Sequence, residues 1–312
     1  MENDKDSRIF HRRNFVRMRQ NGYLRLMSSV TRFAPSPNGL LHVGHALSAI
    51  FAHDLARANG GRFLLRIEDI DVARRRPEFV TAIFEDLNWL GLTWEEPVLV
   101  QSEHFPEYLA AADRLIQMGL LYPCFATRSD IAAAADAEKT DPDGAPLYPG
   151  IWRGASAEDV TQRMESGDSP ALRLNMDAAM KALAEKRGDA PLTFVEVAED
   201  GARETRTAQP QRWGDAVIVR KDVPASYHLA VVVDDARQGV THVTRGQDLF
   251  AATDLQRLLQ ELLELPEPVY SHHRLIKWSN GQKLSKSNED MGLRALREEG
   301  ATAEDIRRVI FS

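Results

Sequence analysis

Two histidines and a glycine, His42, Gly44 and His45, follow two prolines, Pro35 and Pro37, at the predicted start of a helix. The first N–H groups of a helix lack partners within the helix, and its dipole favours an anion there. Gly44 has no side chain, so a phosphate or a flat base could approach the backbone. The imidazoles can donate hydrogen bonds to oxygens that gain charge in a transition state. The alternative is a turn whose two histidines only cap the helix.

A second stretch with chemical potential is KLSKS at residues 283–287. Alone it is typical of a solvated basic loop, as most short runs of lysine and serine are. Asn280 and Gly281 precede it, and this pair is a turn signal that favours a mobile loop. Its two lysines, Lys283 and Lys286, could neutralise a phosphate that leaves with negative charge.

Together, HVGH at residues 42–45 and KLSKS resemble the paired signatures of class I aminoacyl-tRNA synthetases, in the same order and more than two hundred residues apart. The strings RFAPSPNGLLHVGH, LLRIEDID, VTRGQDLF and HHRLI are similar to those of the glutamyl-tRNA synthetase group. Within that group the chain resembles the short glutamyl-queuosine tRNA(Asp) synthetases. The resemblance spans about residues 30–290 and does not include the N-terminal arm.

The resemblance implies a glutamate site. Glutamate carries two carboxylates and one ammonium; Arg fits a carboxylate with two parallel hydrogen bonds, and an acid holds an ammonium. By residue type alone, we favour a solvent-facing charge at a strand end for Arg32 and a helix-capping acid for Glu68. The resemblance instead implies that Arg32 and Arg245 clamp carboxylates, without saying which arginine takes which. Tyr227 would donate its hydroxyl and Glu68 would accept the ammonium. The implied glutamate-binding residues are Arg32, Phe33, Ala34, Pro35, Ser36, Glu68, Tyr227 and Arg245.

The implied reaction is attack of the glutamate α-carboxylate on the α-phosphorus of ATP, with pyrophosphate expelled. The substrate supplies the nucleophile, so catalysis consists of positioning and charge stabilisation. His42, His45 and Lys286 are the implied catalytic residues, and Mg²⁺ would come with ATP, held mainly by phosphate oxygens and water. The implied ATP-binding residues are His42, Gly44, His45, Lys283 and Lys286.

One feature of the family is altered. Relatives often hold a structural Zn²⁺ through Cys-x-Cys followed by Tyr-x-x-x-Cys. The matching positions here are Cys124, Ala126, Tyr148 and Trp152. One cysteine and one tyrosine cannot close a tetrahedral structural site, so we expect no zinc and no other protein-bound metal. Packing of Phe125 against Trp152 is our hypothesis for what replaces the metal.

The elements that must position these residues follow a β-α-β-α order. We expect an α/β fold with a doubly wound, Rossmann-type parallel sheet split by an insertion, and a short helical C-terminal segment. The predicted strands are a short one ending near Ala34, 62–67, 216–219, 229–233 and 240–244; the predicted helices are 43–59, 77–90, 103–118, 131–137, 249–263, 292–299 and 303–310. The expected divisions are an N-terminal extension (1–29), the two halves of the catalytic domain (30–120 and 212–273), an irregular, RNA-facing insertion (121–211), and the KLSKS loop with C-terminal helices (274–312).

Bulk properties set further limits. The 312 residues are 43% hydrophobic and 27% charged, which is ordinary for a soluble globular protein. The single cysteine, Cys124, excludes an internal disulfide and fits a reducing, cytoplasmic compartment. No apolar run approaches a membrane span, so no membrane partner is expected.

Charge is unevenly distributed along the chain. Residues 1–29 hold seven Lys/Arg and three Asp/Glu, which gives them a net charge of +4. Because the whole chain has a net charge of −7, the remaining residues carry −11. RNA would therefore bind on local basic patches rather than through net attraction. Residues 1–29 could be a disordered basic arm, a transit peptide or an extension before a start at Met27. The acids near the start argue against a transit peptide, and we favour a poorly ordered extension without a catalytic part.

The expected partners are L-glutamate, ATP and tRNA(Asp) bearing queuosine, and we expect a monomer. Only 26 residues follow Lys286 (312 − 286), too few for the anticodon-binding domain of a full glutamyl-tRNA synthetase. By resemblance, the enzyme would activate glutamate without tRNA and transfer it to queuosine in the anticodon. The alternatives are the catalytic core of a glutamyl-tRNA synthetase that charges the tRNA 3′ end, a non-catalytic paralogue that binds nucleotide or tRNA, and a small nucleotidyltransferase.

Overall fold

The structure, a computed structural model, describes residues 29–276 and 292–311. The predictions for the N-terminal extension up to residue 28, and for Lys283 and Lys286, therefore lie outside the described residues. Within the described ranges, no helix has the length and apolar character needed to cross a membrane.

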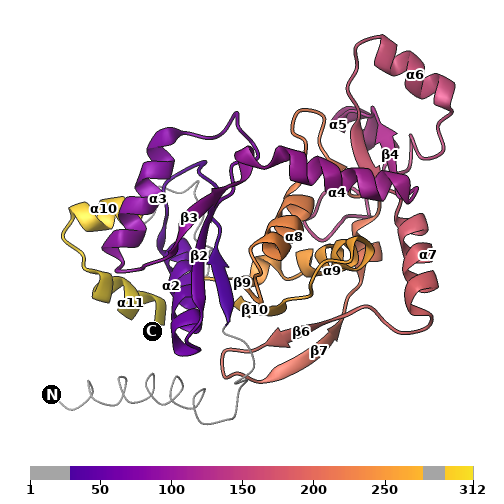
Figure 1. Ribbon diagram of the computed structural model, residues 1–312. Helices are drawn as coiled ribbons and strands as arrows, with labels where there is room; N and C mark the ends of the chain where they lie inside the picture. Colours follow the sequence, from indigo (N-terminus) through magenta and orange to yellow (C-terminus); the bar gives the residue numbers. More distant parts are fainter. Residues whose placement is uncertain (1–28, 277–291, 312) are drawn as a thin grey trace.

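A parallel sheet forms the centre of the fold (Figure 1). Strand β1 pairs in parallel with β2, and β2 with β3, while β9 and β10 form a second parallel pair. Val30 at the start of β1 and Thr241 just before β9 join the two parts. The Thr241 N–H donates to the Val30 carbonyl at 3.0 Å, and the Val30 N–H donates to Thr241 Oγ1 at 2.8 Å. The strands are β1 (Val30–Phe33), β2 (Arg62–Ile67), β3 (Glu95–Val100), β9 (His242–Gly246) and β10 (Val269–His273).

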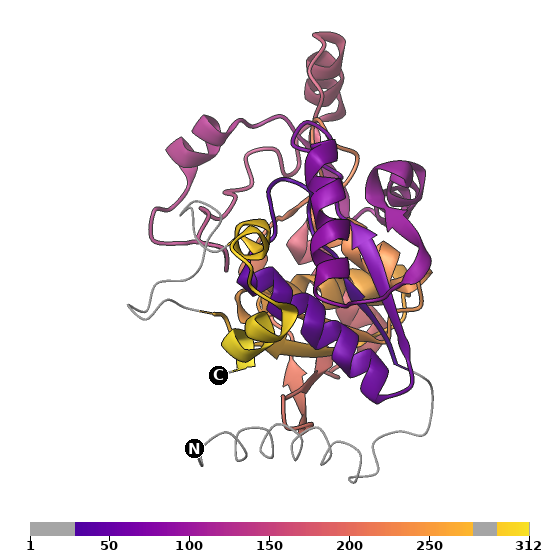
Figure 2. The ribbon, with the colours of Figure 1, turned by 90° about the vertical axis from the view of Figure 1, so that its left-hand side faces the viewer.

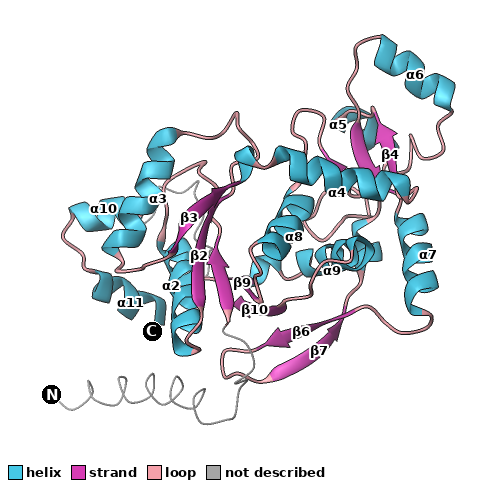
Figure 3. Ribbon diagram, in the orientation of Figure 1, coloured by secondary structure: helices cyan, strands magenta, loops and turns pink. Residues whose placement is uncertain are grey.

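Helices cover both faces of this sheet, as Figure 3 shows, and the predicted doubly wound α/β fold is confirmed. Alternation along β2 explains the two faces, because successive side chains of a strand point to opposite sides. Phe63, Leu65 and Ile67 pack in the apolar cluster of helices α2, α3, α10 and α11, whereas Leu64 joins the cluster of α4, α7, α8 and α9. Arg66 and Glu68 follow Leu64 at two-residue spacing and so lie on the α8 side.

The helix bounds agree closely with the predicted ranges. Gly91 and Gly119 follow α3 and α4 with φ of 73° and 71°, the left-handed conformation that glycine tolerates best and that ends a helix. The helices that flank the parallel sheet are α2 (Val43–Ala58), α3 (Pro77–Trp89), α4 (Phe105–Gln117), α8 (Tyr227–Arg237) and α9 (Ala252–Leu263), with short 3₁₀ turns at Gln101–Glu103, Pro210–Trp213 and Gln247–Leu249.

The predicted strand at residues 229–233 is wrong, because these residues lie inside helix α8. The run of β-branched valines favoured a strand by local propensity. The Ser226 hydroxyl, however, accepts a hydrogen bond from the Leu229 N–H and caps a helix. Burial of the helix against α4 and α9 then outweighs the weak preference of valine for strands.

The insertion is more regular than its scattered prolines and glycines suggested. Strand β8 (Val217–Val219) matches the predicted strand at 216–219 but pairs antiparallel with β5, outside the parallel sheet. The hairpin of β6 and β7 extends the β9–β10 pair, because β6 pairs with β10 to give the strand order β7-β6-β10-β9. The remaining elements are β4 (Leu121–Cys124), α5 (Arg128–Ala134), α6 (Ala157–Glu165), β5 (Ala171–Leu174), α7 (Met176–Arg187), β6 (Thr193–Val197) and β7 (Arg203–Thr207).

Two short helices end the described chain, α10 (Leu293–Glu298) and α11 (Ala303–Phe311), as predicted. Figure 2 shows them packed beside α2 and α3, on the opposite side of the molecule from the insertion in Figure 1. Their buried side chains Leu293, Ile306 and Ile310 complete the apolar cluster of α2. They therefore fix the N-terminal turn of α2, where the predicted site lies.

Candidate active site

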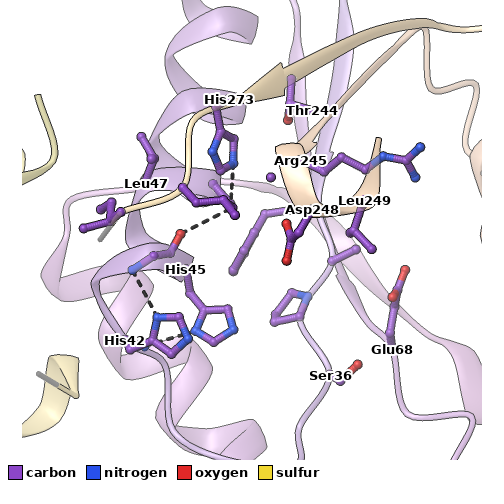
Figure 4. A pocket seen from close by; sticks show the side chains of 18 of the residues that line it. Ser36, His42, His45, Leu47, Glu68, Thr244, Arg245, Asp248, Leu249 and His273 are labelled. Atoms are coloured by element: carbon purple, nitrogen blue, oxygen red, sulfur yellow. Dashed lines mark hydrogen bonds between the residues drawn. The ribbon is translucent and has the colours of Figure 1, made fainter. Parts of the chain in front are cut away.

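One cavity of about 590 Å³ lies at the carboxyl ends of the parallel strands, where open α/β sheets place their ligands. Figure 4 shows it between the start of α2 on one side and β9 with the turn after it on the other. The structure brings together in its wall every predicted site residue that it describes: Arg32, Phe33, Ala34, Pro35, Ser36, His42, Gly44, His45, Glu68, Tyr227 and Arg245.

The two histidines form a reciprocal cap at the N-terminus of α2. Nδ1 of His42 accepts from the Gly44 N–H at 3.1 Å, and Nδ1 of His45 accepts from the His42 N–H at 3.1 Å. Because Nδ1 is an acceptor in both rings, each neutral ring carries its proton on Nε2 and can donate from there. The rings lie side by side with centroids 3.8 Å apart. Capping and a possible catalytic role are thus compatible, since capping uses the opposite nitrogen.

Glycine at position 44 has a local steric reason. A Cβ on Gly44 would lie 2.9 Å from Cε1 of His42, closer than ordinary contacts allow. The imidazole of His42 thus occupies the space that a side chain at position 44 would need. The glycine therefore permits the histidine cap itself, in addition to the close approach of a ligand expected from the sequence.

A buried network of charges lies beneath the cavity. Arg32, which is 4% exposed, donates from Nε and Nη2 to the two Asp235 oxygens at 2.9 and 3.3 Å. Arg66 donates from Nη2 to the same carboxylate at 2.5 Å. Burial alone would raise the pKa of Asp235, but the two guanidiniums hold it below its usual value. The positive charge of Arg32 is therefore largely compensated before any ligand binds.

Glu68 has few interaction partners for a buried carboxylate. Its side chain is 10% exposed, it forms no hydrogen bond within the described residues, and its nearest cation is Arg66 Nη1 at 3.7 Å. Burial raises the pKa of Glu68 to about 7, although Arg66 and Arg32 lower it in part. A cationic group bound in the cavity would supply the partner that this carboxylate lacks, because an ammonium favours its ionised form.

Arg245 differs from Arg32 in its partners. It is 5% exposed and donates to His272 Nε2 at 3.0 Å, Gln256 Oε1 at 2.7 Å, Thr253 Oγ1 at 2.6 Å and the Tyr227 hydroxyl at 3.4 Å. All four acceptors are neutral, and no carboxylate of the described chain forms an ion pair with it. Its charge thus remains available to an anion. Since the Tyr227 oxygen accepts, its proton can be donated onward.

The residues on either side of the KLSKS region lie at the same place. Ile276, the last residue described before it, lines the cavity. Gly292, the first described after it, forms a bridge with His42, and the Leu293 N–H donates to the Leu41 carbonyl at 2.9 Å. Lys283 lies seven positions after Ile276, and Gly292 lies six positions after Lys286 (283 − 276 and 292 − 286).

The positions that match the zinc ligands of relatives do not fit a metal site. Cys124 is buried and donates from Sγ to the Tyr148 hydroxyl at 3.3 Å, and that oxygen also accepts from the Trp152 N–H at 2.8 Å. Ala126 offers no ligand atom. The rings of Phe125 and Trp152 lie 4.9 Å apart, so this part of the insertion is joined by hydrogen bonds and aromatic packing.

Comparison with known proteins decides the family. Residues 28–311 match the family described as tRNA synthetases class I (E and Q), catalytic domain. The chain is a class I tRNA synthetase catalytic domain. This match confirms the resemblance drawn from HVGH and KLSKS. Synthetases of this class are ligases that use ATP.

Similar relatives are of two kinds. A glutamyl-Q tRNA(Asp) synthetase of Rhodobacter capsulatus is 49% identical over 285 residues, which cover 90% of this chain and 99% of the relative. A glutamate--tRNA ligase 2 of Rhodospirillum rubrum is 37% identical and is covered over 57% of its length. A crystal structure of glutamate-tRNA synthetase from Elizabethkingia anophelis superimposes with a TM-score of 0.68 at 26% identity, covering 88% of this synthetase domain and 54% of that chain.

Three residues of this synthetase site carried no role in the sequence analysis. Asp235 follows the valine run after Tyr227, and His272 lies in the motif HHRLI, to which no residue role was assigned. Arg66 lies two residues before Glu68 on β2, so strand alternation places both on one face. The two-residue spacing is therefore the sequence signal that indicates Arg66 as a site residue. The position of Asp235 could not be predicted, because residues 229–233 before it were assigned to a strand and not to helix α8.

Proposed function

We propose that this chain activates L-glutamate with ATP, without tRNA, and then transfers the glutamyl group to queuosine in the anticodon of tRNA(Asp). The 49% identity to a glutamyl-Q tRNA(Asp) synthetase, over 99% of that relative, carries this choice. The cavity supports glutamate as the substrate, because it is lined by both Arg245, a buried arginine that forms no ion pair within residues 29–276 and 292–311, and Glu68, a buried carboxylate whose side chain accepts no hydrogen bond from these residues.

In the binding mode that we propose, Arg245 takes the side-chain carboxylate of glutamate, since it forms no ion pair within the described residues, and Glu68 takes the ammonium. In Figure 4, His42 and His45 lie across the pocket from Arg245 and Glu68. The α-carboxylate then points toward the histidines, where the α-phosphate of ATP would lie. Arg32, already paired with Asp235, helps to hold the substrate and the arrangement of this wall, and residues 33–36 contribute the rest of the contact surface.

The first step joins an α-carboxylate oxygen to the α-phosphorus and breaks the bond to pyrophosphate. The Nε2–H groups of His42 and His45 stabilise the phosphate oxygens as charge develops. Lys286, assisted by Lys283, neutralises pyrophosphate, and Mg²⁺ arrives with ATP as part of the substrate. In the second step, a hydroxyl of the queuosine cyclopentenediol attacks the glutamyl carbonyl carbon, loses its proton and releases AMP.

Two domain-level proposals accompany this function. Residues 30–120 and 212–273 form the two halves of the catalytic domain, and the insertion at 121–211 holds the RNA. We also propose that the protein acts in the cytoplasm as a monomer on tRNA(Asp).

The deciding experiment supplies labelled glutamate and ATP with tRNA(Asp) that carries or lacks queuosine, and maps the labelled nucleotide after nuclease digestion. We expect glutamate-dependent pyrophosphate exchange without tRNA, and alkali-labile label only on the queuosine-bearing anticodon nucleotide. Label on the 3′-terminal adenosine would instead identify a glutamyl-tRNA synthetase activity. Absence of both exchange and transfer would favour a non-catalytic paralogue.

A further inference from the structure

Two buried arginines, Arg32 and Arg245, line the cavity, and they differ in whether a carboxylate is in direct contact with the guanidinium. Asp235 pairs with Arg32 through two hydrogen bonds. Arg245 faces only neutral acceptors within the described chain, although a carboxylate, that of Glu196, lies close behind one of them. The group that separates Arg245 from Glu196 is the imidazole of His272.

The hydrogen bonds fix the state of this imidazole. A guanidinium can only donate, so His272 Nε2, which lies 3.0 Å from Arg245 Nε, must be the acceptor and carry no proton. Nδ1 then holds the proton and donates it to Glu196, whose oxygens lie 2.9 and 3.1 Å away. Glu196 also accepts from the His272 backbone N–H at 2.9 Å, which fixes the orientation of the carboxylate.

The surroundings keep His272 neutral. Its side chain is fully buried, and burial together with the positive charge of Arg245 lowers its pKa, against the opposing effect of Glu196. The ring packs between Phe250, with centroids 4.9 Å apart, and Tyr270, with centroids 6.2 Å apart. Arg245 on β9, Glu196 on β6 and Tyr270 on β10 are the titratable groups that face it, and α9 contributes the neutral Thr253. His273, the next residue on β10, adds a small effect that lowers the pKa of His272.

We propose that His272 is a positioning residue that determines specificity for a carboxylate-bearing amino acid. Its neutral ring aims the Arg245 guanidinium while holding the Glu196 carboxylate one imidazole away, so the charge of Arg245 is not cancelled. The inference rests on the proposed function, since it assigns the selection of glutamate over glutamine to this charge. An acid in direct contact with Arg245 would occupy the guanidinium, as Asp235 occupies that of Arg32, and would compete with the substrate carboxylate.

The test moves one carboxylate without changing the total charge. In the double variant His272→Glu/Glu196→Gln, the acid stands where the imidazole was and can contact Arg245. The matched control is His272→Gln, whose amide oxygen can accept from Arg245 and whose amide N–H can donate to Glu196. The readout is tRNA-independent pyrophosphate exchange with glutamate and with glutamine, and the melting temperature of each variant is measured alongside.

We expect the double variant to raise the KM for glutamate by about 100-fold, because a buried charge pair must be displaced, with a much smaller change in kcat. Its preference for glutamate over glutamine should fall by a similar factor, an effect that loss of packing alone would not produce. We expect His272→Gln to keep both values within about threefold of the parent, since its hydrogen-bond pattern is preserved.

A double variant with parental KM and parental selectivity would overturn the proposal. Equal loss of selectivity in both variants would also overturn it, because the position of the charge would then be irrelevant. If the double variant does not fold, Glu196→Gln alone decides. Its amide oxygen can still accept from His272 Nδ1, and the imidazole already separates Arg245 from this position, so we expect the KM for glutamate to stay within about threefold of the parent. A KM that falls about tenfold or more would show that Glu196 offsets the charge of Arg245 and would overturn the proposal. A parent enzyme without glutamate-dependent exchange would instead refute the proposed function.

Discussion

Asp235 on α8 holds Arg32 on β1 in a two-point contact, with Nε–Oδ1 and Nη2–Oδ2 distances of 2.9 and 3.3 Å. These residues are more than two hundred positions apart in the chain, and both are at most 5% exposed. The contact joins the first strand of the sheet to the helix that carries Tyr227. A buried ion pair therefore holds this wall of the cavity in place, and it is already formed without a bound substrate.

We expect Asp235→Asn to destabilise the fold by about 3–5 kcal/mol, because it leaves the buried guanidiniums of Arg32 and Arg66 without a full counter-charge. Urea unfolding followed by circular dichroism measures this change. Asp222→Asn, which alters an exposed contact to Arg220, is the control and should change stability by less than about 0.5 kcal/mol. Equal stability of the two variants would contradict the importance of the buried pair.

Glu68→Gln should abolish glutamate binding and yet stabilise the protein above neutral pH. The folded-state pKa of Glu68 is raised from 4.5 to about 7, so the folded state binds this proton more tightly than the unfolded chain. Stability contributed by this group is therefore lost as pH rises from 4.5 to about 7. Removing the charge should restore on the order of 1–3 kcal/mol at pH 8.

The same group predicts the pH dependence of activity. The KM for glutamate should fall as pH rises through about 7, because ionised Glu68 binds the substrate ammonium. Steady-state pyrophosphate exchange between pH 6 and pH 8.5 measures this dependence. A glutamate KM that does not vary over this range would argue that Glu68 is not the ammonium partner.

Gly44→Ala should slow adenylate formation by about tenfold to a hundredfold, because the new Cβ displaces the His42 ring from its position. The stability of the fold should change little, because the higher helix propensity of alanine offsets the loss of the His42 cap. Exchange kinetics and a thermal melt on the same preparation separate the two effects. Parental exchange rates in the variant would show that the position of the His42 ring is unimportant.

Lys286→Ala should nearly abolish glutamate-dependent pyrophosphate exchange, because no other charge would neutralise the departing pyrophosphate as well. The control is Lys181→Ala on α7, which removes an exposed lysine that pairs with the exposed Glu185. It should leave both exchange and the melting temperature unchanged. If Lys286→Ala keeps the parental exchange rate, the assignment of this lysine is wrong.

The zinc expectation remains a prediction to be tested by elemental analysis. We expect far less than one zinc per chain and no change in melting temperature with EDTA. Tyr148→Phe should cost about 1–2 kcal/mol, because the Cys124 thiol and the Trp152 N–H both lose their acceptor. Stoichiometric zinc in the purified protein would contradict our interpretation of these positions.

The sequence alone determined the local elements that place the site. The β1 to α2 turn with HVGH, the strand ending at Glu68 and the helices closed by Gly91 and Gly119 all follow local rules of turn geometry, capping and hydrophobic spacing. The motifs with Arg32, His42, Glu68 and Arg245 also predicted a shared pocket, because each lies at the carboxyl end of a predicted parallel strand or at the start of a predicted helix. Tyr227 is the exception, since it precedes the incorrectly predicted strand at 229–233. Residues with strong local signals could therefore be predicted.

Only the tertiary structure decided how the charges are paired. The valine run before Asp234 and Asp235 favours a strand locally, and burial between two helices makes it a helix instead. No spacing rule indicates that Asp235 would pair with Arg32, or that His272 would separate Arg245 from Glu196. These partners come from separate strands and helices, and the energy of a buried charge depends on what surrounds it in space. The sequence thus placed two arginines in one pocket, and the fold determined which of them keeps its charge for a ligand.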